Sequence, residues 1–305
     1  MPLPNFLVIG AMKAATTSLY HYLGQHPDVY VSPMKETSFF ALEGHPLDFD
    51  GAEGRAVIGP WARRASVTDI AAYRALFDGV AGETAIGEAS PLYLYHPDAP
   101  PRIARYVPNA KLIAVLRDPA ERAYSAFLYM RRDGREPIAD FAGALAAEPA
   151  RIRASWEWMW HYRAVGFYHR QLRRYFDLFP AEQIRVWLYE DLRANAAAVV
   201  RDVFRFLGVD DAFTPDTSLA HNRSGVPRSE RAIRLLNRPN PLRSALRALL
   251  PSDARRRIRI RLQDLLLAKP PSLDPVVRRD LVASYREDVL ALGRLIGRDL
   301  SHWLA

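Results

Sequence analysis

A chain of 305 residues with 49% hydrophobic residues can bury one large core, and it contains no cysteine. The absence of cysteine excludes a disulfide framework, a thiolate nucleophile and a cysteine-ligated zinc site. The 42 Lys and Arg residues exceed the 34 Asp and Glu residues, and the net charge of +8 favours anionic partners such as nucleotides, acidic glycans, nucleic acid or a membrane surface.

The N-terminus predicts a protein that is neither secreted nor membrane-spanning. Its first apolar run, residues 6–9, begins close to Met1 and is soon followed by Gly10 and Lys13, which leaves no room for a signal peptide or a membrane span. We therefore expect a cytoplasmic location. The 8 histidines include no H-E-x-x-H or similar short pair, so we expect no metal site.

Three apolar runs, each followed by a helical pattern, predict the fold. The expected strands are residues 5–9 (NFLVI), 111–116 (KLIAVL) and 184–188 (IRVWL). The first strand is followed by a helix over residues 16–23, and Pro119 stands in the first turn of the second helix. This alternation predicts an α/β fold of P-loop-like topology, with a mostly parallel sheet flanked by helices.

The chain is expected to form one domain over residues 1–228 and, over residues 229–305, a helical C-terminal extension of the same domain. Two less regular stretches, residues 41–68 and 210–228, are expected to be long loops. Long loops beside a parallel sheet are where binding surfaces usually form.

The segment that joins the first strand to the first helix, residues 10–18 (GAMKAATTS), is expected to bind an anion. A helix N-terminus adds about half a positive charge, Lys13 adds a full one, and small side chains let the backbone approach an oxyanion closely. The members of this cradle are Lys13, Ala14, Ala15, Thr16, Thr17 and Ser18. The segment is not a standard P-loop, because no second glycine precedes the lysine, and an ordinary strand-to-helix turn is the alternative.

A second cationic element follows the strand at residues 111–116. Arg117 leaves the end of that strand, and Ser125 lies two turns into the next helix. The arginine fork can bind a phosphate through two hydrogen bonds, and the serine hydroxyl can add another. The alternative is that Arg117 pairs with Asp118 or Glu121 and stabilises only the helix.

Taken together, these two elements resemble the 5′-phosphosulfate loop and the 3′-phosphate site of sulfotransferases that use 3′-phosphoadenosine 5′-phosphosulfate (PAPS), particularly the bacterial and heparan-sulfate-type branch. The similarity covers the chain from residue 5 to residue 230. The motifs that carry it are GAMKAATTS at 10–18, HPDV at 26–29, KETSFF at 35–40, GEASPLY at 87–93, RDPAERAYS at 117–125, GFY at 166–168, FPAEQIRVWLYEDL at 179–192 and SGVPR at 224–228.

The resemblance implies an enzyme that moves a sulfonate from PAPS to a hydroxyl of a carbohydrate, a glycolipid or another small alcohol, without a metal. The product nucleotide would be adenosine 3′,5′-bisphosphate (PAP). The resemblance also implies that Lys13 and the residues up to Ser18 contact the phosphosulfate, that Arg117 and Ser125 hold the 3′-phosphate, and that Glu36 is the general base. Lys13 would also offset charge on the leaving phosphate oxygen.

Two departures from the heparan-type pattern concern the donor site. Ala89 stands between Glu88 and Ser90, where such relatives carry a lysine, so a second lysine near the sulfonate is missing or comes from elsewhere. The late K-G-R-type loop is also absent. We expect residues 224–228 to replace it, with Arg228 contacting the nucleotide.

The acceptor is expected to lie between the loop at residues 41–68 and the aromatic cluster at residues 156–162 (WEWMWHY). Aromatic faces stack on sugars or hold lipid tails, although the same cluster suits core packing. Lys35 beside Glu36 is expected either to assist the donor site or to be a solvated charge. The basic amphipathic stretch at residues 243–267 suits either contact with a membrane or acidic polymer, or packing of its leucines on the domain.

Two rival functions stay open from the sequence alone. An ATP- or GTP-dependent phosphotransferase would use the same anion loop, with Asp118 or Asp191 holding magnesium, and would lose activity with a chelator. A non-catalytic binder of anionic polymers would use the basic C-terminal half and lose affinity steeply with salt. Nucleic acid is not an expected partner, because the chain has no recognisable nucleic-acid-binding motif.

Overall fold

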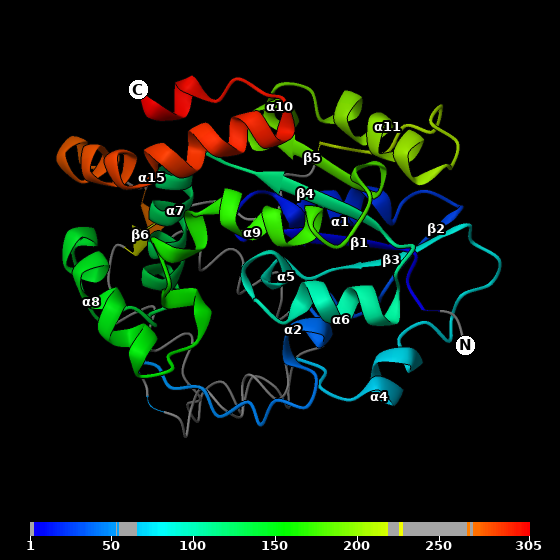
Figure 1. Ribbon diagram of the computed structural model, residues 1–305, viewed down its shortest axis with the longest axis horizontal. Helices are drawn as coiled ribbons and strands as arrows, with labels where there is room; N and C mark the ends of the chain where they lie inside the picture. Colours follow the sequence, from blue (N-terminus) through cyan, green and yellow to red (C-terminus); the bar gives the residue numbers. More distant parts are fainter. Residues whose placement is uncertain (1–2, 53, 55–65, 219–225, 228–266, 269–270) are drawn as a thin grey trace.

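The computed structural model describes residues 3–52, 54, 66–218, 226–227, 267–268 and 271–305. In this part of the chain, five parallel strands form one sheet in the order β2-β3-β1-β4-β5 (Figure 1). The strands are β1 (Phe6–Gly10), β2 (Val29–Val31), β3 (Ala85–Ala89), β4 (Lys111–Leu116) and β5 (Ile184–Leu188). The predicted α/β fold is confirmed, and β1, β4 and β5 are the three strands that the sequence predicts.

Helices lie on both sides of this sheet (Figure 1). The described α-helices are α1 (Thr16–Leu23), α2 (Phe39–Leu42), α4 (Ile70–Ala75), α5 (Leu92–Tyr95), α6 (Ala99–Tyr106), α7 (Pro119–Arg132), α8 (Phe141–Arg153), α9 (Tyr168–Phe176), α10 (Tyr189–Ala194), α11 (Ala196–Leu207) and α15 (Pro275–Ile296). The short elements are the 3-10 helices η1 (Trp158–Trp160), η2 (Ala164–Gly166), η3 (Ala181–Gln183) and η4 (Ser301–Leu304), and the paired strands β6 (Val226–Pro227) and β7 (Leu267–Ala268). α1 packs against β1, β2, β3 and α11. α5 packs against β1 and also contacts α6 and α9.

β1 is the central strand, and all of its residues are buried. Phe6 is in register with Gly87 of β3 and with Lys111 of β4. Parallel strands that are covered on both faces carry continuous apolar runs, which is why β1 and β4 are recognisable in the sequence. Gly10 ends β1 where α5 packs against it, since a Cβ at this position would lie 2.6 Å from the Cβ of Leu94.

The sheet has a topological switch point between β1 and β4. From β1 the chain passes through α1 to β2 on one side of the sheet, and from β4 it passes through α7 to β5 on the other. Open α/β sheets bind ligands in the crevice that forms at such a point, beyond the carboxyl ends of the strands. The loop at residues 10–18 and Arg117 follow these two strands, so the fold brings both predicted anion-binding elements to one edge.

The C-terminal helix α15 packs against α7 and α9. Asp288 accepts hydrogen bonds from the backbone amides of His169 and Arg170 in the first turn of α9, at 2.9 and 3.3 Å. Arg278 pairs at 3.0 Å with Asp118, the N-cap residue of α7. α15 therefore fixes the first turns of both helices against the domain.

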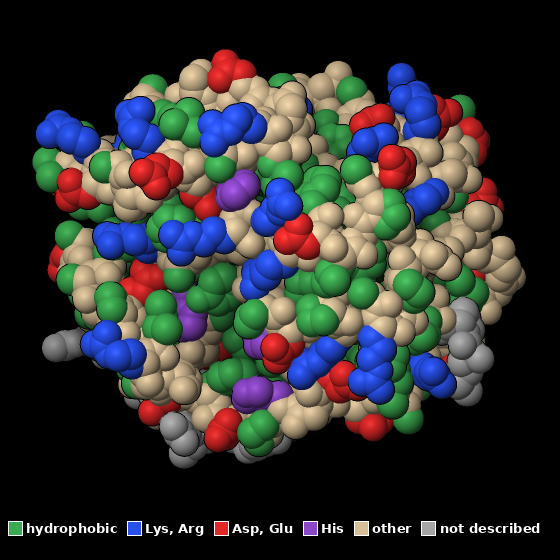
Figure 2. All heavy atoms as spheres, in the orientation of Figure 1, with side chains coloured by type: hydrophobic (Ala, Val, Ile, Leu, Met, Phe, Trp, Pro, Cys, Tyr) green, Lys and Arg blue, Asp and Glu red, His purple; other side chains and the backbone are tan. Residues whose placement is uncertain are grey.

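Several predictions for the C-terminal half fall outside the described residues. These are the domain boundary between residues 228 and 229, the contact of Arg228 with the nucleotide, and the basic stretch up to residue 266. Within the described ranges, no helix is both long and apolar enough to cross a membrane. On the face that Figure 2 shows, Lys and Arg side chains are interspersed with Asp and Glu and do not gather into one basic patch.

Candidate active site

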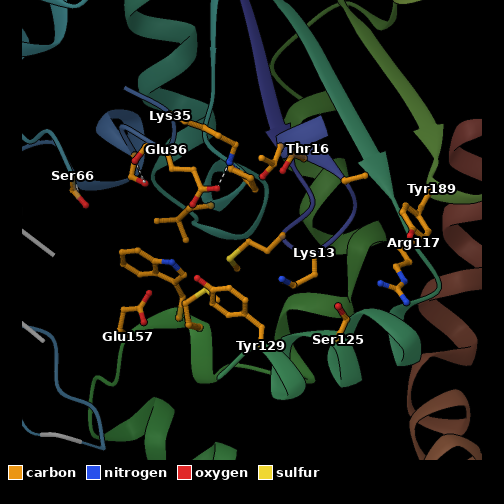
Figure 3. A pocket seen from close by; sticks show the side chains of 18 of the residues that line it. Lys13, Thr16, Lys35, Glu36, Ser66, Arg117, Ser125, Tyr129, Glu157 and Tyr189 are labelled. Carbon is orange, nitrogen blue, oxygen red and sulfur yellow. Dashed lines mark hydrogen bonds and ion pairs between the residues drawn. The ribbon is translucent and has the colours of Figure 1, made fainter. Parts of the chain in front are cut away.

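A cavity of about 610 Å³ opens at the carboxyl ends of β1 and β4 (Figure 3). The predicted site residues that line it are Lys13, Ala15, Thr16, Thr17, Glu36, Arg117 and Ser125. Ala14 and Ser18 belong to the same loop but have buried side chains, so we expect any contact with a ligand to use their backbone. The structure thus brings together most of the residues that the sequence assigns to one site.

The loop between β1 and α1 has backbone conformations that are uncommon for residues with a side chain. Lys13 and Ala15 have φ angles of 69° and 62°, in the left-handed region, which costs about 1 kcal/mol per residue outside glycine. Left-handed residues beside right-handed ones turn successive N–H groups to one side and form an anion-binding concavity. Ala15 is also the N-cap residue of α1 and has no polar side chain for the first-turn amides, which leaves these donors for a ligand.

Lys13 lies in the middle of the cavity (Figure 3). Its Nζ is 4.1 Å from the ring centroid of Tyr129 in α7, a cation–π contact. Burial, and to a smaller extent the charge of Arg132, lowers the pKa of Lys13 from 10.5 to about 8. The ammonium group is therefore poorly solvated, and an anionic group beside it would interact strongly with it.

Arg117 and Ser125 lie at one end of the cavity, with Tyr189 beside the guanidinium group (Figure 3). The guanidinium carbon of Arg117 is 4.8 Å from the ring centroid of Tyr189, and one of its nitrogens is 3.5 Å from a Glu121 carboxylate oxygen. The ion pair between Arg117 and Glu121, which the sequence offered as the alternative, is therefore present. Because the Glu121 side chain is 42% exposed, this pair contributes little to stability. A guanidinium group has five N–H donors, so this pair still allows it to bind a phosphate.

Glu36 lies toward the opposite end of the cavity from Arg117 (Figure 3). It belongs to the segment after β2, where its backbone amide donates to the carbonyl of Ala89 at 2.9 Å and its φ angle is 63°. Its carboxylate pairs with Lys35, and its side chain is 56% exposed. Lys35 also lines the cavity, so an ammonium group is present there although Ala89 carries none.

A buried carboxylate, that of Glu88 in β3, holds the segment that carries Glu36. The hydroxyl groups that donate to it belong to Ser90 (2.7 Å), Thr37 (3.2 Å), Tyr73 (3.2 Å) and Tyr93. Burial raises the pKa of Glu88, and the hydroxyl donors oppose this effect. Because Thr37 follows Glu36 directly, the network fixes the backbone next to the candidate base.

Glu88→Ala is expected to destabilise the fold by about 3 kcal/mol, because several buried hydroxyl groups lose their acceptor. Urea unfolding, monitored by circular dichroism, measures the change in the free energy of unfolding. The matched control is Glu182→Ala, which removes an exposed carboxylate. Equal unfolding midpoints for the two variants would show that the network contributes nothing to stability.

Two segments that are distant in the sequence meet at the end of the cavity away from Arg117. Glu157 and Trp158 line it, and a parallel bridge joins their segment to the loop at residues 41–68. The Asp50 amide donates to the carbonyl of Ser155 at 3.1 Å, and the Glu157 amide donates to the carbonyl of Asp50 at 3.0 Å. The two segments between which the sequence predicts the acceptor are therefore in contact.

The aromatic residues of the cluster at 156–162 have different environments. Trp158 lines the cavity, whereas Trp160 and Tyr162 are fully buried in the core. Core packing is therefore confirmed for Trp160 and Tyr162, and contact of Trp158 with an acceptor stays a prediction.

Sequence analysis assigned no individual role to several residues that line the cavity, among them Tyr129, Arg135, Glu157 and Tyr189. Tyr129 lies one turn after Ser125 in α7, and Tyr189 directly follows β5, so helical spacing and strand ends offered a signal for these two. Glu157 belongs to the cluster at residues 156–162, but the sequence gave it no role of its own, and its placement depends on the bridge to Asp50.

The carboxylates considered as magnesium ligands have other partners. Asp118 accepts from two first-turn amides of α7 and pairs with Arg278, and Asp191 pairs with Arg298 at 3.1 Å. Among the residues that the structure describes, no three His, Cys, Asp or Glu side chains gather as metal ligands would.

Comparison with known proteins identifies the family of this chain. The model of the sulfotransferase family matches residues 4–215. This chain belongs to the sulfotransferase family. A solved member of the family, the sulfotransferase from Alicyclobacillus acidocaldarius, is similar to it with a TM-score of 0.76 and 36% sequence identity, and the similarity covers 100% of both chains.

Curated sulfotransferase relatives are similar over part of their length. The human bifunctional heparan sulfate N-deacetylase/N-sulfotransferase 3 is 30% identical over 220 residues, which are 68% of this chain and 22% of the relative. The membrane-associated sulfotransferase kil1 of Dictyostelium discoideum is 35% identical over 140 residues, 45% of this chain and 26% of the relative. The matches therefore span only 22% and 26% of these two relatives.

Proposed function

We propose that this protein transfers a sulfonate group from PAPS to a hydroxyl group of a carbohydrate, a glycolipid or another small-molecule alcohol. The observation that carries the proposal is the order of groups along one cavity, with Arg117 and Ser125 at one end, Lys13 in the middle and Glu36 toward the other end (Figure 3). Family membership supports a sulfonate as the transferred group.

The anion-binding groups suit a donor that carries negative charge at two separate positions. Arg117 and Ser125 suit a 3′-phosphate, because a guanidinium fork binds phosphate through two hydrogen bonds and the hydroxyl adds a third. The first turn of α1, with Lys13 and the hydroxyl of Thr16, suits the 5′-phosphosulfate. ADP and ATP lack a 3′-phosphate, so they would leave Arg117 without its proposed partner.

Glu36 is the proposed general base. Its carboxylate takes the proton of the acceptor hydroxyl while the acceptor oxygen forms its bond to sulfur. The bond between sulfur and the bridging phosphate oxygen breaks, and its electron pair stays on that oxygen as PAP forms. Lys13 offsets the charge that develops there, as cations do in phosphoryl transfer.

Arg117→Ala is expected to weaken the binding of PAP by about 10- to 100-fold, because a charge-assisted hydrogen bond contributes about 1.5–3 kcal/mol. Calorimetric titration with PAP, ADP and ATP measures the affinities of the wild type and the variant. Arg173→Ala is the matched control, since Arg173 is an exposed residue of α9 that pairs with Asp177. A wild type that binds ATP more tightly than PAP would contradict the proposal and favour a phosphotransferase.

A further inference from the structure

The ring of Tyr129 contacts the ammonium group that the proposed function places next to the donor. Tyr129 lies in α7, one turn after Ser125, and its side chain extends into the cavity beside Lys13 (Figure 3). Nζ of Lys13 is 4.1 Å from the centroid of this ring. At this distance, the face of the ring attracts a cation electrostatically.

A lysine ammonium group needs a partner to stay at one position. Its stem of four carbons is flexible, so the head group samples many positions when nothing holds it. The loop fixes the backbone of Lys13, with a φ angle of 69°, but this does not fix the end of the side chain. Contact with the face of a ring restricts it, because the negative quadrupole of that face attracts the cation.

A neutral ring holds the ammonium group without cancelling its charge. Lys35, which also lines the cavity, instead pairs with the carboxylate of Glu36, and such a pair has no net charge. The Tyr129 ring stays neutral, since burial raises the pKa of its hydroxyl group above the usual range. An anionic group that enters the cavity therefore meets the full charge of Lys13.

Charged groups from α7, from the end of β4 and from the segment after β2 also act on Lys13. Burial lowers its pKa most, and Arg132 and Arg117 lower it further. Asp133 and Glu36 oppose this effect. Arg132 contacts the same aromatic ring, with its guanidinium carbon 4.6 Å from the centroid, and its Nε donates to Asp133 at 3.0 Å. The ring thus adds attraction for a cation that burial disfavours.

We infer that Tyr129 is a positioning residue, whose ring holds the ammonium group of Lys13 at the donor position both before and after the nucleotide binds. The inference rests on the proposed function, because it concerns how Lys13 meets the donor. Tyr129 acts through its ring and not through its hydroxyl group. Phenylalanine should therefore replace it, whereas an aliphatic side chain should not.

Nuclear magnetic resonance of lysines labelled with carbon-13 at Cε tests the contact itself. The chain has four lysines, Lys13, Lys35, Lys111 and Lys269, and Lys13→Ala assigns the signal of Lys13 by its loss. In the wild type, the ring current of Tyr129 should shift the Hε protons of Lys13 upfield from those of free lysine. Tyr129→Leu should abolish this shift, Tyr129→Phe should retain it, and the signal of Lys111 should not change.

The pH titration of the same signal tests the attraction. Leucine retains an apolar surface beside Lys13 but lacks the quadrupole, so the charged form loses stabilisation. The midpoint for Lys13 in Tyr129→Leu should therefore lie below the wild-type value of about 8. Tyr129→Phe should titrate as the wild type does.

Calorimetric titration with PAP at pH 7 tests the consequence for the donor. Tyr129→Leu should bind PAP about tenfold more weakly than the wild type, whereas Tyr129→Phe should bind it within about twofold of the wild type. In the Lys13→Ala background, Tyr129→Leu should weaken the affinity no further, because a positioning residue acts only through the group that it holds.

The outcomes that overturn the inference are distinct from those that overturn the proposed function. The inference fails if Tyr129→Leu leaves the Lys13 signal unchanged, if this variant binds PAP as tightly as the wild type or more tightly, or if it loses equal affinity with and without Lys13. Tighter binding would show that the ring withholds Lys13 from the nucleotide. A wild type that does not bind PAP would instead overturn the proposed function, while the Lys13 signal would still show whether the ring holds the ammonium group.

Discussion

Glu36→Gln should lower kcat by about 10²- to 10⁴-fold and leave the affinity for PAP unchanged. The amide preserves the shape of the side chain but cannot take a proton from the acceptor hydroxyl. Because Glu36 and Arg117 lie toward opposite ends of the cavity, loss of the carboxylate leaves the contacts of the 3′-phosphate in place (Figure 3). Single-turnover sulfonate transfer measures the chemical step, and calorimetry measures the affinity for PAP.

Two comparisons make the Glu36 result specific. Glu182→Gln changes a distant exposed carboxylate and should retain full activity. Lys35→Met removes the ion pair but retains the carboxylate, so it should cost less activity than Glu36→Gln. A loss of less than tenfold in Glu36→Gln would show that another group takes the proton.

Lys13→Ala should lower kcat by about 10²- to 10³-fold and also weaken PAP binding, because the ammonium group is proposed to contact the donor both before and during transfer. The same transfer assay and calorimetry measure both effects. Lys111→Met is the matched control, since Lys111 lies at the amino end of β4, where its Nζ donates to the carbonyl of Leu207. Unchanged PAP affinity in Lys13→Ala would remove Lys13 from the donor site.

The lowered pKa of Lys13 gives this prediction a pH signature. With a pKa of about 8 in the free protein, the side chain is protonated below that pH and loses its charge as the pH rises through it. The affinity of the wild type for PAP should therefore fall above about pH 8. In Lys13→Ala this decrease should be absent, because no lysine titrates at that position. A variant that retains the same decrease would assign it to another group.

The parts of the fold that were predictable are those with strong local patterns. β1 and β4 are continuous apolar runs, and α7 begins with Asp118 and Pro119, a cap and a first-turn proline. β3 was missed because Gly87 and Glu88 interrupt its apolar pattern. Tertiary contacts explain both residues, since a Cβ at Gly87 would lie 2.5 Å from the ring of Phe6 and Glu88 is the acceptor of a buried hydroxyl network.

In the candidate site, too, some residues could be predicted from local patterns and others could not. Arg117 was predictable because it stands where a strand ends, at the edge that parallel sheets use for ligands. The left-handed conformation of Lys13 was not, since nothing about lysine favours a positive φ angle and only the surrounding fold imposes it. The sequence placed Glu157 in the cluster at residues 156–162, but its environment was not predictable, because it comes from a bridge to Asp50, far away in the chain.

The bridge between Asp50 and the segment of Glu157 bears on how such enzymes diverge. Lys13 and Arg117 follow the central strands, whereas two irregular segments that hydrogen-bond to each other meet at the far end of the cavity. Substitutions in that pair leave β1 and β4 untouched. Under the proposed function, the acceptor end of the cavity can be altered without altering the donor end, and the two segments form the natural unit to exchange together when the enzyme is re-engineered for a new alcohol.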